Sequence, residues 1–375
     1  MKKKKTALLQ YIPMLVFLVI GGVCGALMVR YIDPMIEGKS DSAIIFFFIA
    51  AIIELYAAIY LQIIIHEAGH LVFGLLSGYK YSSFRIGSFM WVKTDGKLKF
   101  KRFSLAGTGG QCLMIPPEMK DGKIPYVLYN LGGSLMNTAV SAVALVLYVV
   151  SGIGYFSLFC MIFAVIGFGF ALMNGVPMRL GTVDNDGYNA LSLGKNAGAL
   201  RSFWVQMKAN EQVARGVRLK DMPKEWFGLP SDEEMQNSMT AVMGVFYCNR
   251  LMDEHRFDEA YSVMSELLEK DTAIVGLHSG LMKCDCAYCE LIGENREEKL
   301  NVLLDKQQKK LMRSMKTYPS VIRTEYVYAL LGEKDVSKAE KTLELFEKCA
   351  KTYPYASDIE SEREFIEIAK NRGEQ

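Results

Sequence analysis

The chain has 375 residues, a formal net charge of +2 and a hydrophobic content of 51%. A net charge this small gives no general argument for nucleic-acid binding, and the eight scattered cysteines do not form the framework of a disulfide-rich secreted domain. The long apolar runs lie in residues 1–190, whereas residues 195–375 are rich in charge. This distribution predicts a membrane part followed by a soluble part in a reducing compartment.

The first apolar segment, residues 7–29, follows the basic opening MKKKK. It is long enough to cross a bilayer, which takes about 20 residues, and longer than the apolar core of a cleaved signal peptide. We therefore predict an uncleaved anchor whose lysines are cytoplasmic, because basic residues favour that side. Residues 30–41 would then form an external loop.

A second apolar segment, residues 42–76, contains the motif HEAGH at residues 66–70. As a helix it would exceed the bilayer core of about 30 Å, so we expect it to tilt or protrude, with HEAGH toward the cytoplasmic leaflet. Residues 125–150 and 157–177 are the third and fourth apolar segments. The fold class is therefore predicted as mainly α, a multi-pass protein of the bacterial cytoplasmic membrane with about four spans and both termini cytoplasmic.

Residues 84–102, between the second and third apolar segments, contain strand-like stretches on either side of Asp95-Gly96. An Asp-Gly pair between such stretches is typical of a β-hairpin turn. The hairpin is also basic, which predicts a cytoplasmic location. The basic residues are Lys93, Lys97, Lys99, Lys101 and Arg102.

The soluble part is predicted to comprise a linker at residues 191–237 and a cytosolic helical domain at residues 238–375. Residues 247–270 have the pattern of two amphipathic helices around a turn. The sequence KTYP occurs at residues 316–319 and again at 351–354, a spacing close to the period of tetratricopeptide repeats, about 34 residues. Such a repeat-like domain would either bind a protein partner or act as a stable cap.

Three cysteines of this domain, Cys284, Cys286 and Cys289, lie within six residues. A zinc or redox site would need a further ligand, and none is evident nearby. We therefore expect core positions together with exposed thiols.

HEAGH carries the pattern of a metal site. On a helix, His66 and His70 share one face and can bind one metal ion together, while Glu67 can reach a water on that metal. This is the HExxH arrangement of zinc hydrolases. Unpaired polar groups are costly inside an apolar span, which favours a metal site over two ordinary core histidines.

A catalytic zinc usually has three protein ligands and a water. The other two histidines, His255 and His278, lie in the soluble part, so the third ligand is expected to be a carboxylate. Glu54 lies roughly 18 Å before His66 on a continuous helix and cannot reach. The other candidates are Asp95 at the hairpin turn, Glu118 and Asp121 in a polar loop, and Asp184 and Asp186 after the fourth span. The last pair directly follows the fourth span, on the cytoplasmic side where HEAGH is placed, and the topology therefore favours this pair.

HEAGH, GGSLMN at residues 132–137 and NGVPMRLGTVDNDG at residues 174–187 together resemble the site-2 protease family of intramembrane zinc metalloproteases. That family's late motif has the form NxxPxxxLDG. Asn174 and Pro177 match NxxP, and Asp186 and Gly187 match DG. The resemblance covers about residues 42–190. It implies zinc as cofactor, Asp186 as third ligand and a substrate-holding role for Asn174, and it identifies the hairpin with the family's membrane-associated one.

The chain also departs from the family pattern. Asn185 stands where the family has Leu, and several extra residues separate Pro177 from it, so Asp184 remains a rival ligand. Asn137 belongs to a segment of small residues and an amide, which favours helix packing, with substrate binding as the alternative. Residues 151–155 are too few for the PDZ domain of some members, and the tail is not the CBS-type domain of others.

The leading hypothesis is an intramembrane zinc endopeptidase that cleaves a membrane-embedded or membrane-associated protein or peptide. Glu67 would take a proton from a zinc-bound water and pass it to the leaving amine. A helical substrate would have to unwind, and an edge of the hairpin could then pair with it. The alternative is a catalytically silent membrane scaffold whose tail binds a partner. An ATP-dependent membrane protease is excluded, because the chain has no GxxxxGK[ST] loop.

Overall fold

A computed structural model describes residues 12–94, 96–103, 108–180 and 183–374. The protein is mainly helical and has a small four-stranded sheet. It divides into two compact units. The membrane unit comprises Met1–Lys80, Gly109–Cys112 and Ile124–Lys195, and the tail unit comprises Tyr81–Thr108, Leu113–Lys123 and Asn196–Gln375.

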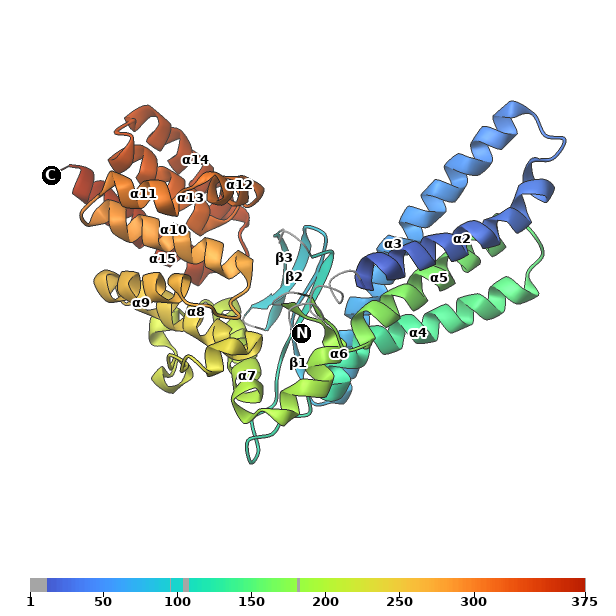
Figure 1. Cartoon of the computed structure of the whole chain (residues 1–375), viewed down its shortest axis with the longest axis horizontal. Coiled ribbons are helices and arrows are strands. Elements are labelled where there is room, and N and C mark those ends of the chain that lie inside the picture. The colour runs from blue at the N-terminus through green and yellow to red at the C-terminus, as the bar shows by residue number, and fades with distance from the viewer. Residues whose placement is uncertain (1–11, 95, 104–107, 181–182, 375) are drawn as a thin grey trace. The chain divides into compact units, whose positions relative to one another are not determined.

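The membrane unit is built from four long helices that lie side by side (Figure 1). Three of them are long and apolar enough to cross a membrane: α3 (Asp41–Leu76), α4 (Val127–Val150) and α5 (Tyr155–Gly175). These three match the predicted second, third and fourth spans. The fourth helix, α2 (Ile12–Ile36), contains a shorter apolar stretch at Leu18–Tyr31, and the first residues of the predicted anchor, 7–11, lie outside the described part of the chain.

Helix α2 extends further than the apolar pattern predicts. It continues through Pro34 to Ile36, so only residues 37–40 connect it to α3, instead of the whole of 30–41. The extension is stabilised by Tyr31, which is 1% exposed and whose hydroxyl lies 2.9 Å from that of Ser157 on α5. Burial of an apolar ring with its hydroxyl paired offsets the backbone hydrogen bond that Pro34 cannot donate.

Helix α3 buries one stripe of its surface against the other helices. The buried positions recur mostly at intervals of three, four or seven residues, with Gly69 and His70 adjacent: Phe47, Ala51, Ala58, Gln62, His66, Gly69, His70 and Gly74. The opposite face carries exposed apolar side chains such as Ile45, Ile49 and Ile53, as expected of a surface in contact with lipid. The stripe changes from apolar to polar at Gln62, and the candidate site begins there.

The remaining elements of the membrane unit follow α5. A two-residue hairpin, β5 (Arg179–Leu180) and β6 (Val183–Asp184), leads into the short helix α6 (Asp186–Ser192) and a 3₁₀ turn at Leu193–Lys195. Helix α6 packs against α4 and α5. None of these short elements has enough apolar periodicity to be predicted.

The predicted hairpin at 84–102 is part of a larger sheet with the strand order β3-β2-β1-β4. The strands are β1 (Lys80–Ile86), β2 (Phe89–Thr94), β3 (Lys97–Arg102) and β4 (Gly110–Ile115). The turn between β2 and β3 is at the predicted place, with Gly96 at a φ of 75°, although Asp95 itself lies outside the described residues. Strand β4 was not predicted, because its six residues, GQCLMI, do not alternate clearly.

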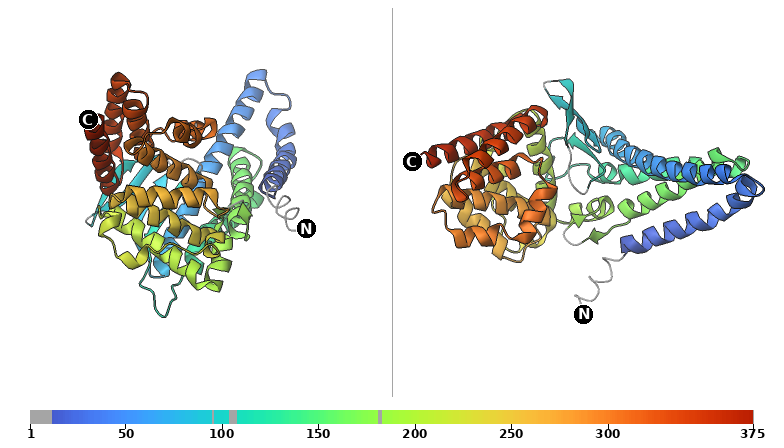
Figure 2. Two further views of the ribbon diagram at one scale, coloured as in Figure 1. Left: turned by 60° about the vertical axis from the view of Figure 1, so that its left-hand side comes forward. Right: turned by 90° about the horizontal axis from the view of Figure 1, so that it is seen from above.

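The tail unit is a stack of helices (Figures 1 and 2). The expected linker at 191–237 contains an 18-residue helix, α7, that packs against α8. The two helices predicted within 247–270 are present as α8 and α9, and KTYP precedes α13. The helices are α7 (Ala197–Ala214), α8 (Ser238–Asp253), α9 (Phe257–Glu269), α10 (Gly276–Ile292), α11 (Glu297–Leu303), α12 (Lys306–Ser314), α13 (Pro319–Val327), α14 (Val336–Thr352) and α15 (Ala356–Gly373), with 3₁₀ turns at Leu219–Asp221, Lys224–Trp226 and Glu234–Gln236 and a π-turn at Tyr328–Gly332.

The core of the tail unit contains the cysteines singled out above. Cys284, Cys286 and Cys289 on α10 are all buried as free thiols, so the expectation of exposed thiols among them is wrong. They lie in one apolar cluster with Met90 and Val92 of the sheet. The sheet and the helical tail therefore share a core.

Candidate metal centre

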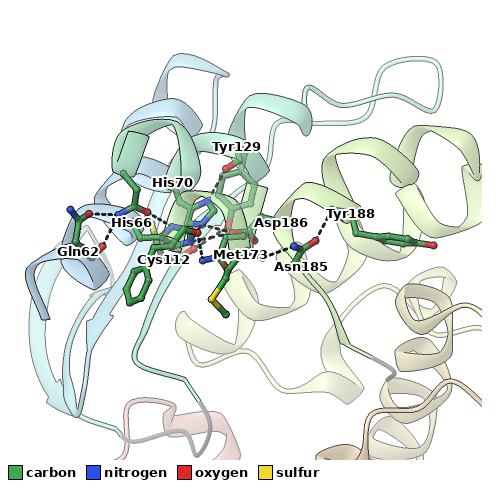
Figure 3. A network of polar contacts seen from close by, with 12 residues as sticks. Gln62, His66, His70, Cys112, Tyr129, Met173, Asn185, Asp186 and Tyr188 are labelled. Atoms are coloured by element: carbon green, nitrogen blue, oxygen red, sulfur yellow. Dashed lines mark hydrogen bonds and ion pairs between the residues drawn. The ribbon is translucent and has the colours of Figure 1, made fainter. Parts of the chain in front are cut away.

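Three side chains from two separate parts of the chain converge in the membrane unit (Figure 3). Asp186 Oδ2 lies 3.1 Å from His66 Nε2 and 3.3 Å from His70 Nε2, and the two Nε2 atoms are 3.2 Å apart. His66 and His70 are separated by one turn of α3, and Asp186 is the first residue of α6. Both histidines are buried, while the Asp186 side chain is 26% exposed.

The buried amides of Asn137 and Gln62 fix the orientation of the His66 ring. Asn137 Nδ2 donates to the backbone and side-chain oxygens of Gln62, at 2.9 and 2.6 Å. This leaves Asn137 Oδ1 as an acceptor, 2.7 Å from His66 Nδ1. Gln62 is held in turn, because its Nε2 donates to the carbonyl of Phe163 and to Ser141. His66 must therefore carry its proton on Nδ1, and the lone pair of a neutral ring is on Nε2.

The His70 ring is oriented in the same way. His70 Nδ1 lies 2.8 Å from the carbonyl oxygen of Tyr129, which can only accept, so this nitrogen also carries the proton. The Tyr129 ring is fixed by its hydroxyl, which donates to the carbonyl of Cys112 at 3.0 Å. Each histidine thus presents the lone pair of Nε2 to the same point.

The three facing atoms fit a zinc ion. Two imidazole lone pairs and a carboxylate oxygen are all acceptors, and a cation between them satisfies all three. Zinc bonds of about 2.0–2.1 Å in a tetrahedron give edges of about 3.3 Å. The observed separations of 3.1, 3.2 and 3.3 Å agree with that value.

Glycines allow α3 and α4 to approach closely beside the site. A Cβ on Gly132 would lie 2.6 Å from the carbonyl oxygen of Gly69, and one on Gly69 would overlap the Gly132 carbonyl. A Cβ on Gly133 would overlap the His66 ring. The glycine within HEAGH and the pair in GGSLMN thus leave room for direct backbone contact, as the small residues predict.

Asn185 positions Asp186. It is the N-cap of α6, and its Oδ1 accepts from the backbone nitrogens of Tyr188 and Met178, both at 2.9 Å. Its Nδ2 donates to the carbonyls of Met173 and Val176, both at 2.7 Å. One side chain therefore ties the start of α6 to the end of α5. This explains Asn at a position where Leu was expected.

Asp184 takes no part in the cluster. Its carboxylate accepts from Arg179 Nε at 2.6 Å and from Arg179 Nη2 at 3.2 Å. The bidentate pair closes the small hairpin β5–β6. Gly187, on the other side of Asp186, packs so closely against the Gly175 carbonyl that any Cβ would overlap it. Asp186 is thus held from both neighbouring positions.

The electrostatics of the cluster favour an ionised Asp186. Burial raises the pKa of this carboxyl, but when the His66 and His70 rings also carry a proton on Nε2, their hydrogen bonds to the carboxylate outweigh burial and hold its pKa well below its usual range. An ionised carboxylate is the form that binds a cation.

Glu67 lies one position after His66 and is partly buried. Its side chain lies against Gly110 at the start of strand β4, where a Cβ on this glycine would lie 2.6 Å from Glu67 Cγ and 2.8 Å from Oε1. Gly110 thus provides the space for the carboxylate beside the metal cluster.

The two predicted substrate-binding amides differ in their surroundings. Asn137 is 0% exposed and faces His66. Asn174, on the last turn of α5, is partly buried and donates from Nδ2 to the carbonyl of Phe170 on its own helix at 3.1 Å.

Sequence reasoning missed Gln62, Tyr129, Asn185 and Gly110 as parts of the site. Gln62 had a usable signal, because a buried amide in an apolar span one turn before the first histidine of HEAGH needs partners. The other three act through backbone groups or by lacking a side chain, and no local pattern reveals such roles.

A family model described as Peptidase family M50 matches residues 54–354, which are 301 of the 375 residues. Searches of curated proteins and of solved structures gave no match. The match begins at Glu54 in α3 and extends through most of the tail, beyond the three motifs of the sequence analysis.

Proposed function

Because the chain belongs to peptidase family M50, the site-2 protease family of membrane metalloproteases, we propose that it is a zinc endopeptidase acting within the membrane. Its substrate is a membrane-embedded or membrane-associated protein or peptide. The observation that carries the proposal is the convergence of His66, His70 and Asp186 beside Glu67.

Zinc would be held by His66 Nε2, His70 Nε2 and Asp186 Oδ2, and when bound it supplies the Lewis acidity that activates water and polarises a peptide carbonyl. Asn137 and the Tyr129 carbonyl keep both rings in the ligating tautomer. Glu67 is the general base: its carboxylate accepts the proton of the attacking water and delivers it to the leaving nitrogen.

The substrate chain must be extended for its carbonyl to reach this site, because a helix uses its carbonyls in internal hydrogen bonds. An unwound segment in a lipid setting needs new backbone partners. Strand β4 is at an edge of the sheet and begins at Gly110, beside Glu67. We therefore place substrate pairing on β4 by strand addition, instead of on the β2–β3 hairpin. Asn174 remains a candidate for side-chain contacts with the substrate.

This placement can be tested with a photo-reactive amino acid at Gln111 in β4 or at Lys97 in β3, on the opposite edge. In the inactive Glu67→Gln background, Gln111 should cross-link to the substrate and Lys97 should not. Cross-linking from Lys97 alone would place the substrate on the other edge.

The orientation is proposed from charge alone. The basic residues of β3 and the lysines at the start of the chain favour the cytoplasmic side. Both termini and the tail unit would then be cytoplasmic.

The function is tested by comparing the membrane proteomes of cells with the wild-type protein and with Glu67→Gln. The variant keeps all three metal-binding side chains but lacks the base, so an intact substrate should accumulate only in the variant. Identical proteomes under all growth conditions would contradict proteolysis. A catalytically silent scaffold would also leave the two proteomes identical. It gives no reason, however, for the chain to keep His66, His70 and Asp186 together beside Glu67.

A further inference from the structure

The tail unit contains a cavity that the proposed protease chemistry does not use. It has a volume of about 400 Å³, within the usual range of ligand pockets, about 300–1,000 Å³. Its walls come from helices α7, α8, α10 and α15 and from the start of α13. All of these belong to one compact unit, so a single body lines the cavity, which is partly open to the surface.

The charge on the cavity walls is unbalanced. Four carboxylates line it, and three are paired: Asp253 with Arg218, and Asp285 and Glu362 with the fully buried Arg323. The fourth, Asp358, has no basic side chain within 4 Å among the described residues. Its recorded side-chain partner is the hydroxyl of Tyr353, at 3.4 Å. A partly buried carboxylate without a cation is a costly feature to keep in a folded domain.

Three further polar side chains in the same cavity have unused hydrogen-bonding groups. His278 Nδ1 is shielded from solvent and has no partner. Burial lowers the pKa of this imidazole, so the ring is neutral at pH 7. The amides of Asn210 on α7 and Asn249 on α8 also line the cavity, and no side-chain hydrogen bond is recorded for either in the described part of the chain. An asparagine amide can donate a hydrogen bond to a peptide carbonyl and accept one from a peptide N–H, so it is complementary to a peptide backbone.

We propose that this cavity binds an extended peptide segment and takes up one of its lysine or arginine side chains, with Asp358 as the counter-ion. The free amides of Asn210 and Asn249 pair with the peptide backbone. The choice of a cation follows from the unbalanced carboxylate. The choice of a peptide over a small free amine follows from the two amides. The site is separate from the metal centre and does not depend on catalysis.

Binding is measured by fluorescence anisotropy on the full-length protein in detergent. The probe is a labelled pentapeptide, Ala-Ala-Lys-Ala-Ala, and its control has norleucine instead of lysine. A hydrogen-bonded charge is worth about 1.5–3 kcal/mol, so the lysine peptide should bind roughly tenfold or more tightly than the control. N-acetyl-lysinamide, which lacks the flanking peptide groups, should compete more weakly than the unlabelled pentapeptide. Equal binding of the lysine and norleucine peptides, or no binding of either, would overturn the proposal.

Two variants separate the contributions of the charge and the amide. Asp358→Asn should remove the preference for the lysine peptide over the norleucine peptide. Asn249→Ala should lower the binding affinity of both peptides by the same factor. The matched control is Glu360→Gln, which removes the same charge from an exposed position on the same helix and should change nothing. Glu67→Gln should also bind like the wild type, so a failure of this proposal and a failure of the proteolytic function are distinguishable. If Glu360→Gln changed binding as much as Asp358→Asn, the lysine preference would reflect general surface charge, and the proposed site would be refuted.

A stability measurement distinguishes a binding role from a structural role for Asp358. Burial, and next the charge of Glu362, raise the pKa of Asp358 to about 7. The unfolded value is about 3.9, so ionisation of Asp358 destabilises the fold progressively as the pH rises from about 4 to about 7. The other charged or titratable groups lining the cavity are Arg218, Asp253, His278, Asp285, Tyr318, Tyr353 and Tyr355.

Asp358→Asn should therefore raise the melting temperature of the unliganded protein at pH 8 and leave it unchanged near pH 4. All three tryptophans, Trp91, Trp204 and Trp226, belong to the tail unit, so their fluorescence reports on this unit directly. A variant that is more stable and yet loses the lysine preference supports a binding role. Destabilisation by Asp358→Asn at pH 8 would show that the carboxylate is structural and would contradict the proposal.

Discussion

Single side chains decide which of two neighbouring aspartates lies against the two histidines. Asp184 is tied up by Arg179 in a small hairpin, whereas Asp186 is aimed at the histidines by Asn185. The motif comparison left this choice open, because Asn185 departs from the family's pattern. Its four hydrogen bonds are to backbone groups 3 to 12 residues away, and of these only the N-cap bond to Tyr188 follows a spacing rule.

Asn185 gives a prediction at this scale. Asn185→Leu restores the family's residue but removes all four hydrogen bonds, so Asp186 should lose its fixed position. Outer-sphere changes of this kind typically cost about 10–100-fold in metal affinity. Chelator competition measures the effect, with Asn189→Leu on the same short helix as control. An unchanged zinc affinity in Asn185→Leu would refute the positioning role.

The close contact between helices α3 and α4 depends on glycines, which let the two backbones approach each other directly. Apolar runs were enough to predict α3, α4 and α5, because each is long and apolar enough to cross a bilayer. The crossing point at Gly69 and Gly132 was indicated only by the presence of small residues. The short elements β4 and α6, which complete the site, have too few residues for any period to be read.

The close crossing should not tolerate a methyl group. In Gly133→Ala the new Cβ would overlap the His66 ring, so the ring must move and zinc binding should fall. Gly152→Ala is the matched control, since a Cβ there meets nothing within 4 Å. Metal analysis of both variants is the measurement. Full zinc occupancy in Gly133→Ala would mean that the helices are not packed this tightly.

The sheet carries an exposed apolar face that suits a membrane surface. Cross-strand pairing places Trp91 opposite Phe100, and both rings are exposed together with Phe89 and Leu98. Aromatic residues beside basic ones favour the lipid interface. With Trp204 and Trp226 replaced by Phe, brominated lipids should quench the fluorescence of Trp91. Quenching should weaken in Phe100→Asp, and a complete absence of quenching would place this face away from lipid.

At the scale of the whole molecule, the order of the parts followed from the distribution of apolar residues. The membrane half and the helical half lie where composition changes. In the structure, residues 81–108 and 113–123 belong to the tail unit although they lie between membrane helices in the sequence. Their apolar residues, such as Met90 and Val92, are buried in the tail's core. Long-range burial of this kind is invisible to any local pattern.

The limited reach of local sequence patterns also explains which parts of the two candidate sites could be predicted. HEAGH could be interpreted locally, because both histidines and Glu67 lie on one turn of helix. The proposed third ligand, Asp186, is 116 positions beyond His70, so the spacing of residues gave no direct signal, and only topology and resemblance favoured it. The tail cavity gave no signal at all, since Asn210, Asn249, His278 and Asp358 come from four different helices.

The zinc content of purified variants tests the central claim most directly. Wild type, Glu67→Gln and Asp184→Ala should each retain about one zinc per chain, since none of these changes removes a proposed ligand. Asp186→Ala should retain little, because only two ligands remain. The opposite pattern, with zinc lost in Asp184→Ala and kept in Asp186→Ala, would contradict the assigned ligand set. A folded wild-type protein that binds no zinc would contradict the account as a whole.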